Sequence, residues 1–452
     1  MSFRPDFAWG AATASYQIEG AALEDGKGLS VWDVLSHQDG FVKNNDNGDV
    51  ACDHYHRYKE DVQLMKQMGL KAYRFSISWP RILPNGTGQI NEKGLDFYDK
   101  LVDELVANGI EPYITLFHWD MPNELFIRGG LLNPDFPQWF AQYTKAVVER
   151  LSDRVTNWIT LNEPQCHIIL GHKLGVHAPG LQMADEYILQ ITHNMLLAHG
   201  RSVQAIRQYA KKTPAIGYAP VFGYVMPRTD SKEDIELAKK MTFSCNKEAG
   251  VFSEPWWNTP IFEGHYPEDG LKLWEKYLPK IGQDDMNIIK QPLDFYGFNF
   301  YRSEVSATME GGNPDVGIIH RVGENLTHFD WEMTPEGLYY ISKAIYEKYK
   351  LPLVITENGI ANMDWVSLDG KVHDPQRIDY LQRHLIQLKR AVLEGVDVQG
   401  YMHWSLMDNF EWAAGYYKRF GMIYVDYETQ ERILKDSAFW YQKVIASNGE
   451  IL

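Results

Sequence analysis

The chain has 452 residues, of which 44% are hydrophobic and 23% are charged, and its formal net charge is -16. This composition is that of a globular protein with a large core, so it excludes a disordered chain. The acidic balance opposes a nucleic-acid partner, because phosphate binding requires clustered Lys and Arg side chains.

The sequence predicts one domain over residues 1–452. No Ser/Gly-rich linker, repeat or long charge run marks a boundary. No apolar run is long enough to span a bilayer, and the first strand-like segment begins at residue 7, which leaves no room for a signal peptide. The three cysteines, Cys52, Cys166 and Cys245, lack metal-binding or disulfide spacing. We therefore expect a cytoplasmic protein without a membrane partner.

Apolar, β-rich runs recur along the chain, and helical patterns lie between them. Eight strands are predicted, at residues 7–13, 70–77, 110–117, 155–161, 214–221, 293–300, 351–356 and 397–404. Two of the intervening helices, at 91–109 and 374–395, have apolar residues at three- and four-residue spacing. A glycine ends several of these helices just before the next strand, as in "KQMGL", "VANGI" and "VLEGV".

This alternation predicts a closed parallel (β/α)8 barrel, which is the TIM-barrel fold. An open nucleotide-binding sheet is disfavoured, because no glycine-rich phosphate loop follows a strand. The long intervals at 222–292 and 301–334 are predicted to be loop insertions at the carboxyl-terminal rim of the strands. Active sites of such barrels lie at that rim, where residues that end different strands converge.

Two predicted strands end in a carboxylate. Glu163 follows the strand in "WITLNEP", and Glu357 follows the strand in "VITENG". We expect these strands, the fourth and the seventh, to face each other across the barrel. Two carboxyl groups that flank a cavity are what glycoside cleavage requires: one is a proton donor and the other is ionised.

Neighbouring residues are expected to separate the pKa values of the pair. Arg74, at the end of the second strand, would keep Glu357 anionic, and Tyr301 would donate a hydrogen bond to it. Glu163 has no cation nearby in the sequence, so its burial would favour the neutral acid. As isolated residues, Glu163 and Glu357 are each also compatible with a simple turn.

Other strand ends carry residues suited to a sugar, whose C–H faces stack on Trp and whose hydroxyls pair with polar side chains. The candidate binding residues are Gln17, His118, Trp119, Asn162, Asn299, Trp331, Trp404, Glu411 and Trp412. Most of the 14 tryptophans should belong to the core, among them Trp158, Trp256 and Trp257.

Metal catalysis is the competing chemistry. His54 and His56 are two residues apart near a predicted helix start, so their side chains point to different faces. His118 has no second ligand at a suitable local spacing. We therefore predict no metal and no cofactor.

Eight stretches of the chain, between about residues 5 and 440, together resemble glycoside hydrolase family 1, the retaining β-glucosidases and their relatives. They are "FAWGAATASYQIEGA", "YRFSISWPRI", "TLFHWDMP", "TLNEP", "GVHAPG", "YGFNFY", "ITENG" and "WSLMDNFEW". The resemblance implies a (β/α)8 barrel with Glu163 as acid/base and Glu357 as nucleophile. It also implies that Arg74 and Tyr301 support the nucleophile.

The resemblance further implies hydrolysis of cello-oligosaccharides and aryl β-glucosides, with β-fucosides and β-galactosides as further substrates. Because Glu411 and Trp412 are both present, a charged Glu411 is expected to repel 6-phosphorylated sugars. Many relatives have Trp after "NEP", whereas this chain has Gln165, which we expect to line the leaving-group subsite. A transglycosylase with the same carboxyl pair and a non-catalytic sugar-binding protein are the alternatives.

Overall fold

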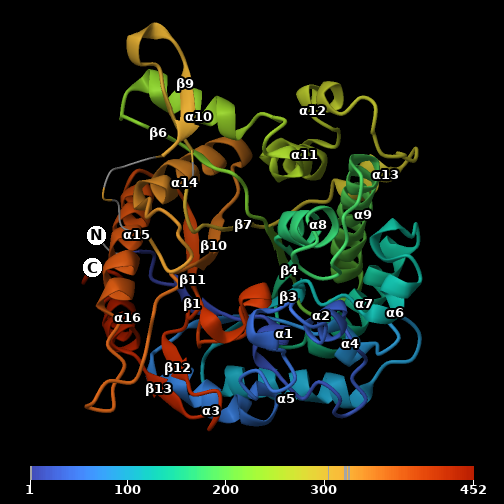
Figure 1. The fold of residues 1–452 in the computed structure, drawn as a ribbon, viewed down its shortest axis with the longest axis vertical. Helices are drawn as coiled ribbons and strands as arrows, with labels where there is room; N and C mark the ends of the chain where they lie inside the picture. The colour runs from blue at the N-terminus through green and yellow to red at the C-terminus, as the bar shows by residue number, and fades with distance from the viewer. Residues whose placement is uncertain (1–2, 304, 320–322, 324–325) are drawn as a thin grey trace.

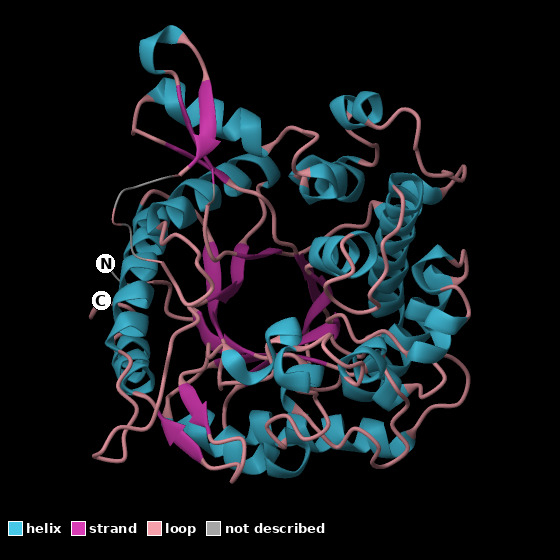
Figure 2. Cartoon of the chain, viewed as in Figure 1, coloured by secondary structure: helices cyan, strands magenta, loops and turns pink. Residues whose placement is uncertain are grey.

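The structure is a computed structural model, and it describes residues 3–303, 305–319, 323 and 326–452. Eight parallel strands form a ring with helices around it, as Figure 1 and Figure 2 show. The strands are β1 (Ala8–Ala12), β2 (Ala72–Ser76), β3 (Glu111–Phe117), β4 (Asn157–Asn162), β5 (Ala215–Ala219), β7 (Tyr296–Asn299), β10 (Leu353–Asn358) and β11 (Val398–Trp404). Each predicted strand is confirmed, and so is the TIM-barrel fold.

The strands lie side by side in the order β5-β4-β3-β2-β1-β11-β10-β7. The ring closes between β5 and β7 through backbone hydrogen bonds. Asp294 N donates to Ile216 O over 2.8 Å, and Asn299 N donates to Pro220 O over 2.9 Å. β4 and β10 are thus three steps apart around the ring, with β5 and β7 between them. The expectation that they face each other directly is wrong, because in an eight-membered ring the strand opposite β4 is β11.

Larger helices surround the ring, and both predicted helices are confirmed. The surrounding helices are α3 (His54–Gln67), α5 (Glu92–Ala107), α7 (Phe136–Leu151), α9 (Asp185–Tyr209), α14 (Pro335–Tyr349), α15 (Pro375–Leu393) and α16 (Asp436–Ala446). The glycines that follow α3, α5 and α15 have left-handed backbones, with φ of 75°, 71° and 96°. Because glycine has no Cβ, it adopts this conformation at little cost and lets the chain turn at once into the next strand.

Alternation of side chains along the strands produces two packed layers. Residues that point inward form a small cluster, which includes Ala12, Ala72 and Met402, while their neighbours pack outward against the helices. The interior is tight: a Cβ on Gly10 would lie 2.4 Å from Met402 Sδ. The barrel is therefore a filled core, and a site can form only at its rim.

Shorter elements occupy the loops. They are α1 (Ser15–Ile18), α2 (Val31–Ser36), α4 (Trp79–Ile82), α6 (Asn123–Ile127), α8 (Pro164–Ile168), β6 (Val225–Pro227), α10 (Lys232–Thr242), α11 (Glu254–Asn258), α12 (Glu268–Leu273), α13 (Asp285–Ile289), β8 (Val305–Thr308), β9 (Asp315–Ile318), β12 (Ile423–Val425) and β13 (Arg432–Leu434).

The two predicted insertions follow the carboxyl ends of β5 and β7, although residues 304, 320–322 and 324–325 of the second lie outside the described residues. The insertions pair with each other, since β6 from the first runs parallel to β8 from the second, and β9 completes a three-stranded sheet. Figure 1 shows this sheet outside the ring, beside α10. In the described part of the chain, no helix is long and apolar enough to cross a membrane.

Candidate active site

The two carboxyl groups lie at the rim in different surroundings. Arg74 Nη1 donates to Glu357 Oε1 over 2.7 Å, and the Tyr301 hydroxyl donates to Glu357 Oε2 over 2.6 Å. Asn299 Nδ2, from the strand β7 that lies between β4 and β10, donates to Glu163 Oε1 over 2.7 Å. Among the described residues, no cation forms an ion pair with Glu163. The surroundings of Glu357 therefore stabilise an ionised carboxylate, whereas those of Glu163, within the described structure, include no direct ion pair.

The pKa values follow from this difference. Burial, with the nearby charge of Glu357 as the second cause, raises the pKa of Glu163 to about 7. Burial also raises the pKa of Glu357, but Arg74 and the Tyr301 hydroxyl oppose that shift. The surroundings therefore favour the proton of the pair on Glu163, because of the two carboxyl groups only Glu357 forms a direct ion pair with Arg74.

Backbone geometry at the strand ends aims these side chains into the rim. Trp119, Glu163 and Trp412 all have positive φ, at 75°, 38° and 49°. This region is unfavourable for residues with a Cβ, and it persists where the surrounding structure imposes it, which is common at functional sites. At Glu163 the turn is set by Pro164, the first residue of α8.

Asn162 fixes the orientation of its neighbours. Its Oδ1 accepts from Arg74 Nη2 over 2.6 Å and from Asn299 Nδ2 over 3.1 Å, so its Nδ2 must be the atom 3.0 Å from His118 Nε2. His118 Nε2 therefore accepts, and the ring carries its proton on Nδ1. Burial, and then Arg74, hold the pKa of His118 well below its usual range. Its Nδ1 is buried without a partner in the described structure, so it is a donor free for a ligand.

Gln17 offers the complementary acceptor. Its Nε2 donates to Phe410 O over 2.8 Å and to Asn409 Oδ1 over 3.0 Å, with a longer contact of 3.5 Å to Glu411 Oε2. Gln17 Oε1 is buried and has no partner among the described residues. An amide fixed on its nitrogen side thus presents a carbonyl oxygen to a hydroxyl group of a ligand.

Glu411 lies near the two other carboxyl groups of the site. Burial raises its pKa to about 8, and the charges of Glu357 and Glu163 add to the shift. The carboxyl group of Glu411 is therefore harder to ionise than that of a solvated glutamate. The expectation that a charged Glu411 repels 6-phosphorylated sugars stays a prediction.

Aromatic rings enclose the polar groups. The ring of Trp412 lies 4.7 Å from that of Trp119 and 4.7 Å from that of Trp32. Trp404 lies 5.8 Å from the His118 ring, and Trp331 lies 5.5 Å from that of Tyr301. Such faces suit the apolar C–H surface of a sugar ring.

A continuous set of contacts thus brings together every residue that the sequence places in the site. Sequence reasoning missed the residues that orient them. Thr356 Oγ1 donates to Asn299 Oδ1 over 2.6 Å, and Arg74 Nε donates to Thr115 Oγ1 over 3.1 Å. Polar residues inside two otherwise apolar strands were the signal. Asn409 and Trp32 were also missed, and only Asn409 lies within a stretch already noted, "WSLMDNFEW".

Comparison with known proteins identifies the family. The profile of glycosyl hydrolase family 1 matches residues 1–450. The chain belongs to this family. It is therefore a glycoside hydrolase, and the resemblance seen in the sequence is confirmed.

Two relatives are similar over their whole length. Beta-glucosidase A of Thermotoga maritima is 48% identical, with 99% of this chain and 98% of that protein covered. A 1,4-beta-D-glucan glucohydrolase of Thermotoga neapolitana is 49% identical, with 99% of both covered. A solved structure of the Thermotoga maritima beta-glucosidase in complex with glucoimidazole superposes with a TM-score of 0.90 and 47% identity, over 99% of both chains.

Gln165 follows Glu163 and Pro164, and the sequence predicts that it lines the leaving-group subsite of this glycoside hydrolase. Gln165 is fully buried, and neither polar atom of its side chain has a partner among the described residues. The proposed place of Gln165 in the leaving-group subsite stays a prediction, because other candidate site residues such as Gln17 are equally buried.

The two histidines weighed as metal ligands, His54 and His56, are instead held by carboxylates. His54 Nδ1 lies 2.7 Å from Asp61 Oδ2 in the core, and the exposed His56 lies 2.5 Å from Asp53 and 3.0 Å from Glu24. Within the described ranges, no group of three His, Cys, Asp or Glu side chains is arranged to hold a metal ion.

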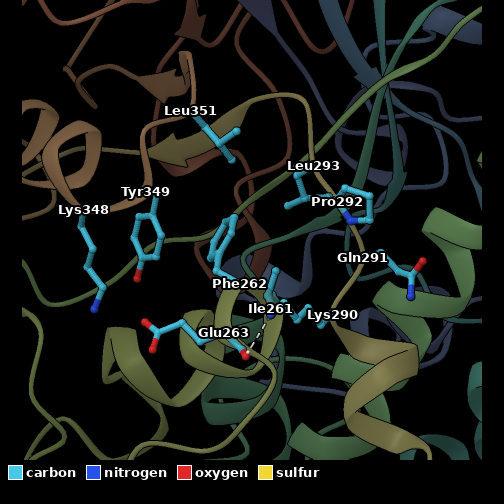
Figure 3. Close-up of a pocket in the computed structure, with 10 residues that line it drawn as sticks. All are labelled: Ile261, Phe262, Glu263, Lys290, Gln291, Pro292, Leu293, Lys348, Tyr349 and Leu351. Atoms are coloured by element: carbon cyan, nitrogen blue, oxygen red, sulfur yellow. Dashed lines mark hydrogen bonds between the residues drawn. The ribbon is translucent and has the colours of Figure 1, made fainter.

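A cavity of about 490 Å³ lies apart from these residues (Figure 3). Phe262, Tyr349 and Leu351 give it an apolar lining, and Lys290 and Lys348 lie at its edge. None of the site residues named above lines it. Its size alone therefore does not mark it as the place of the chemistry.

Proposed function

We propose that the protein is a retaining β-glucosidase. It would remove terminal, non-reducing β-D-glucosyl residues from cello-oligosaccharides and aryl β-glucosides. The substrate is thus a small glycoside, and the full-length similarity to a beta-glucosidase A and to a 1,4-beta-D-glucan glucohydrolase supports this class. The observation that carries the mechanism is the asymmetry of the carboxyl pair: of the two carboxyl groups, only that of Glu357 accepts hydrogen bonds from an arginine and a tyrosine.

In the first step, Glu357 attacks the anomeric carbon as nucleophile, and Glu163 donates its proton to the departing glycosidic oxygen. Arg74 and Tyr301 keep Glu357 ionised and aimed. The raised pKa of Glu163 supports its role as proton donor, because it is still protonated near neutral pH. The products are a covalent glycosyl-enzyme and a free leaving group.

In the second step, Glu163 is ionised and takes a proton from water, which attacks the glycosyl-enzyme. The glycosyl–Glu357 bond breaks, and glucose leaves with its original β configuration. Retention requires the two carboxyl groups to lie about 5 to 5.5 Å apart, so that the nucleophile reaches the sugar directly.

The hydroxyl groups of the glycone would bind to the N–H at His118 Nδ1, to Gln17 Oε1 and to the carboxyl group of Glu411. Asn162 and Asn299 would orient the reacting groups, while Trp119, Trp331, Trp404 and Trp412 would enclose the sugar ring. β-Galactosides and β-fucosides would react as well, because a galactoside differs from a glucoside only in the configuration at C4, and a fucoside differs at C4 and lacks the hydroxyl group at C6. We also propose that residues 1–452 act as one catalytic domain.

Two other functions use the same residues. A transglycosylase differs only in that a sugar hydroxyl replaces water in the second step, and product analysis at high acceptor concentration separates the two. A non-catalytic sugar-binding protein would need the polar and aromatic groups but no raised pKa on Glu163. Turnover of a chromogenic β-glucoside excludes it.

The stereochemical course tests the proposal. Proton NMR of the reaction with an aryl β-glucoside should show β-glucose as the first product, with α-glucose appearing later by mutarotation. The unenzymatic mutarotation of added β-glucose serves as the control. Formation of α-glucose as the first product would rule out the double displacement.

A further inference from the structure

A buried ionic network lies behind the loop that follows β11. Asp408 is its centre: its Oδ1 accepts from Lys435 Nζ over 2.7 Å and from Gly421 N over 3.0 Å. Its Oδ2 accepts from Arg419 Nη1 over 2.6 Å. The side chains of Asp408 and Lys435 are completely buried. Both carboxylate oxygens are thus occupied in the protein interior.

The same lysine connects Asp408 to a second group of charges. Lys435 Nζ also lies 2.6 Å from Asp364 Oδ2, which in turn accepts from Arg377 Nη2 over 2.7 Å. Arg377 pairs with Asp374 as well. Three carboxylates therefore face three cations, and the network links the loop after β10, the start of α15, the loop after β11 and the start of α16.

Asp408 is the member of this network that leads directly to the rim. The next residue, Asn409, accepts from Gln17 Nε2 with its side chain, and the one after it, Phe410, accepts from the same atom with its backbone carbonyl. Phe410 N also donates to Gln17 O over 3.1 Å. Glu411 follows immediately. A shift of the backbone at Asp408 would therefore move the partners of Gln17 and the carboxyl group of Glu411 together.

We propose that Asp408 is a positioning residue for glycone binding. Its ion pairs with Lys435 and Arg419 fix the backbone of residues 409–411, which orients Gln17 through Asn409 and Phe410 and places the side chain of Glu411. The inference deepens the proposed function, on which it rests for the identity of the ligand. Asp408 itself touches no reacting atom.

The physical reason lies in the burial of the charges. An ion pair deep in a protein is costly to form, and replacing one member leaves the other charged and unpaired, so the surrounding backbone must move or water must enter. At Asp408 the backbone that would move bears the binding groups. At Asp364 the same lysine loses a partner, but the affected loop follows β10 and does not contact Gln17. The two aspartates thus form a matched pair for a test.

The experiment measures the affinity for glucoimidazole by calorimetry in Asp408→Asn, Asp364→Asn and Gln17→Ala, and in each aspartate variant combined with Gln17→Ala. We expect Asp408→Asn to weaken binding by about tenfold or more and Asp364→Asn by less than about threefold, at similar losses of thermal stability. In the Gln17→Ala background, Asp408→Asn should have little further effect, because its action passes through that side chain.

Two results would overturn the proposal. One is equal loss of affinity in the two aspartate variants. The other is a double variant in which the fold losses of affinity from Asp408→Asn and Gln17→Ala multiply. This result would show that the two residues act independently. If Asp408→Asn does not fold, Arg419→Gln removes the partner of Oδ2 at a partly exposed position, and the same cycle with Gln17→Ala applies. Inhibitor binding does not depend on turnover, so a wild-type protein that binds glucoimidazole but hydrolyses no β-glucoside contradicts the proposed function and leaves this test intact.

Discussion

At the scale of single residues, the structure gives two identical side chains different surroundings, as the proposed chemistry requires. Glu163 and Glu357 are both buried, yet only Glu357 receives hydrogen bonds from a guanidinium and a phenol. The two roles in glycoside cleavage require one proton donor and one anion. The ion pair with Arg74 is therefore the contact that most clearly distinguishes Glu357 from Glu163.

Removing each carboxyl group should have different consequences. Glu357→Ala should abolish hydrolysis even of dinitrophenyl β-glucoside, because no nucleophile remains, and azide should restore turnover as the α-glycosyl azide. Glu163→Ala should retain hydrolysis of the dinitrophenyl substrate but lose that of cellobiose, since only a poor leaving group needs the proton. Steady-state kinetics on both substrates measure this, and equal losses in both variants would refute the assigned roles.

The pH profile should report the same assignment. The raised pKa of Glu163 means that its proton is present below about pH 7 and is lost as the pH rises through that value. kcat/KM for an aryl glucoside should therefore decline above about pH 7. In Glu163→Ala the alkaline decline should disappear with the dinitrophenyl substrate. A decline that persists unchanged would assign it to another group.

At the scale of elements, the insertion after β5 is fastened to the barrel by a buried carboxyl group. Glu254, in the first turn of α11, accepts from Asn258 Nδ2 over 2.6 Å and from the hydroxyl of Tyr349 at the end of α14. Asn258 also donates to the Tyr296 hydroxyl over 2.6 Å, which ties α11 to β7. Burial raises the pKa of Glu254 to about 7.

This shift predicts a pH-dependent effect on stability. A carboxyl group with a raised pKa binds its proton more tightly in the folded state, so its favourable contribution exists below its unfolded pKa and is lost as the pH rises towards about 7. Glu254→Gln should therefore raise the melting temperature at pH 8 by roughly 2 °C or more, and by less at pH 5. Calorimetry at the two pH values measures the difference. The exposed Glu275→Gln is the control, and a gain that is the same at both pH values would contradict the explanation.

At the scale of the whole molecule, the barrel must close between strands that are far apart in the sequence. β5 and β7 are separated by the insertion that contains α10 to α13, and they meet with little room to spare. A Cβ on Gly297 would lie 2.6 Å from Tyr218 O and 2.9 Å from Thr356 Cγ2. Closure thus depends on the absence of a side chain at this position.

Gly297→Ala should destabilise the protein by about 1–3 kcal/mol or more, because the new methyl group must push β5 or β10 away. Denaturant unfolding measures the loss. Gly223→Ala is the matched control, since a Cβ at that position meets no atom of the described residues within 4 Å. Equal stability of the two variants would show that the closure tolerates a wider gap.

The sequence by itself determined the eight strands, the ring they form and the residues at their ends. Local patterns are sufficient for this, because helix-ending glycines such as Gly69 and polar residues after apolar runs such as Glu357 depend only on neighbours in the chain. Pairing of the insertions through β6 and β8 was not predictable in this way. It joins segments about 80 residues apart that carry no shared pattern.

Only the tertiary structure decided how each group at the rim is used. Asn162 orients His118 because Arg74 and Asn299, from two other strands, occupy its carbonyl oxygen. The burial of Gln165 and the raised pKa of Glu411 also depend on the assembled molecule. Burial removes water from a polar or charged group and so changes its free energy, and residues adjacent in the sequence do not reveal which groups are buried.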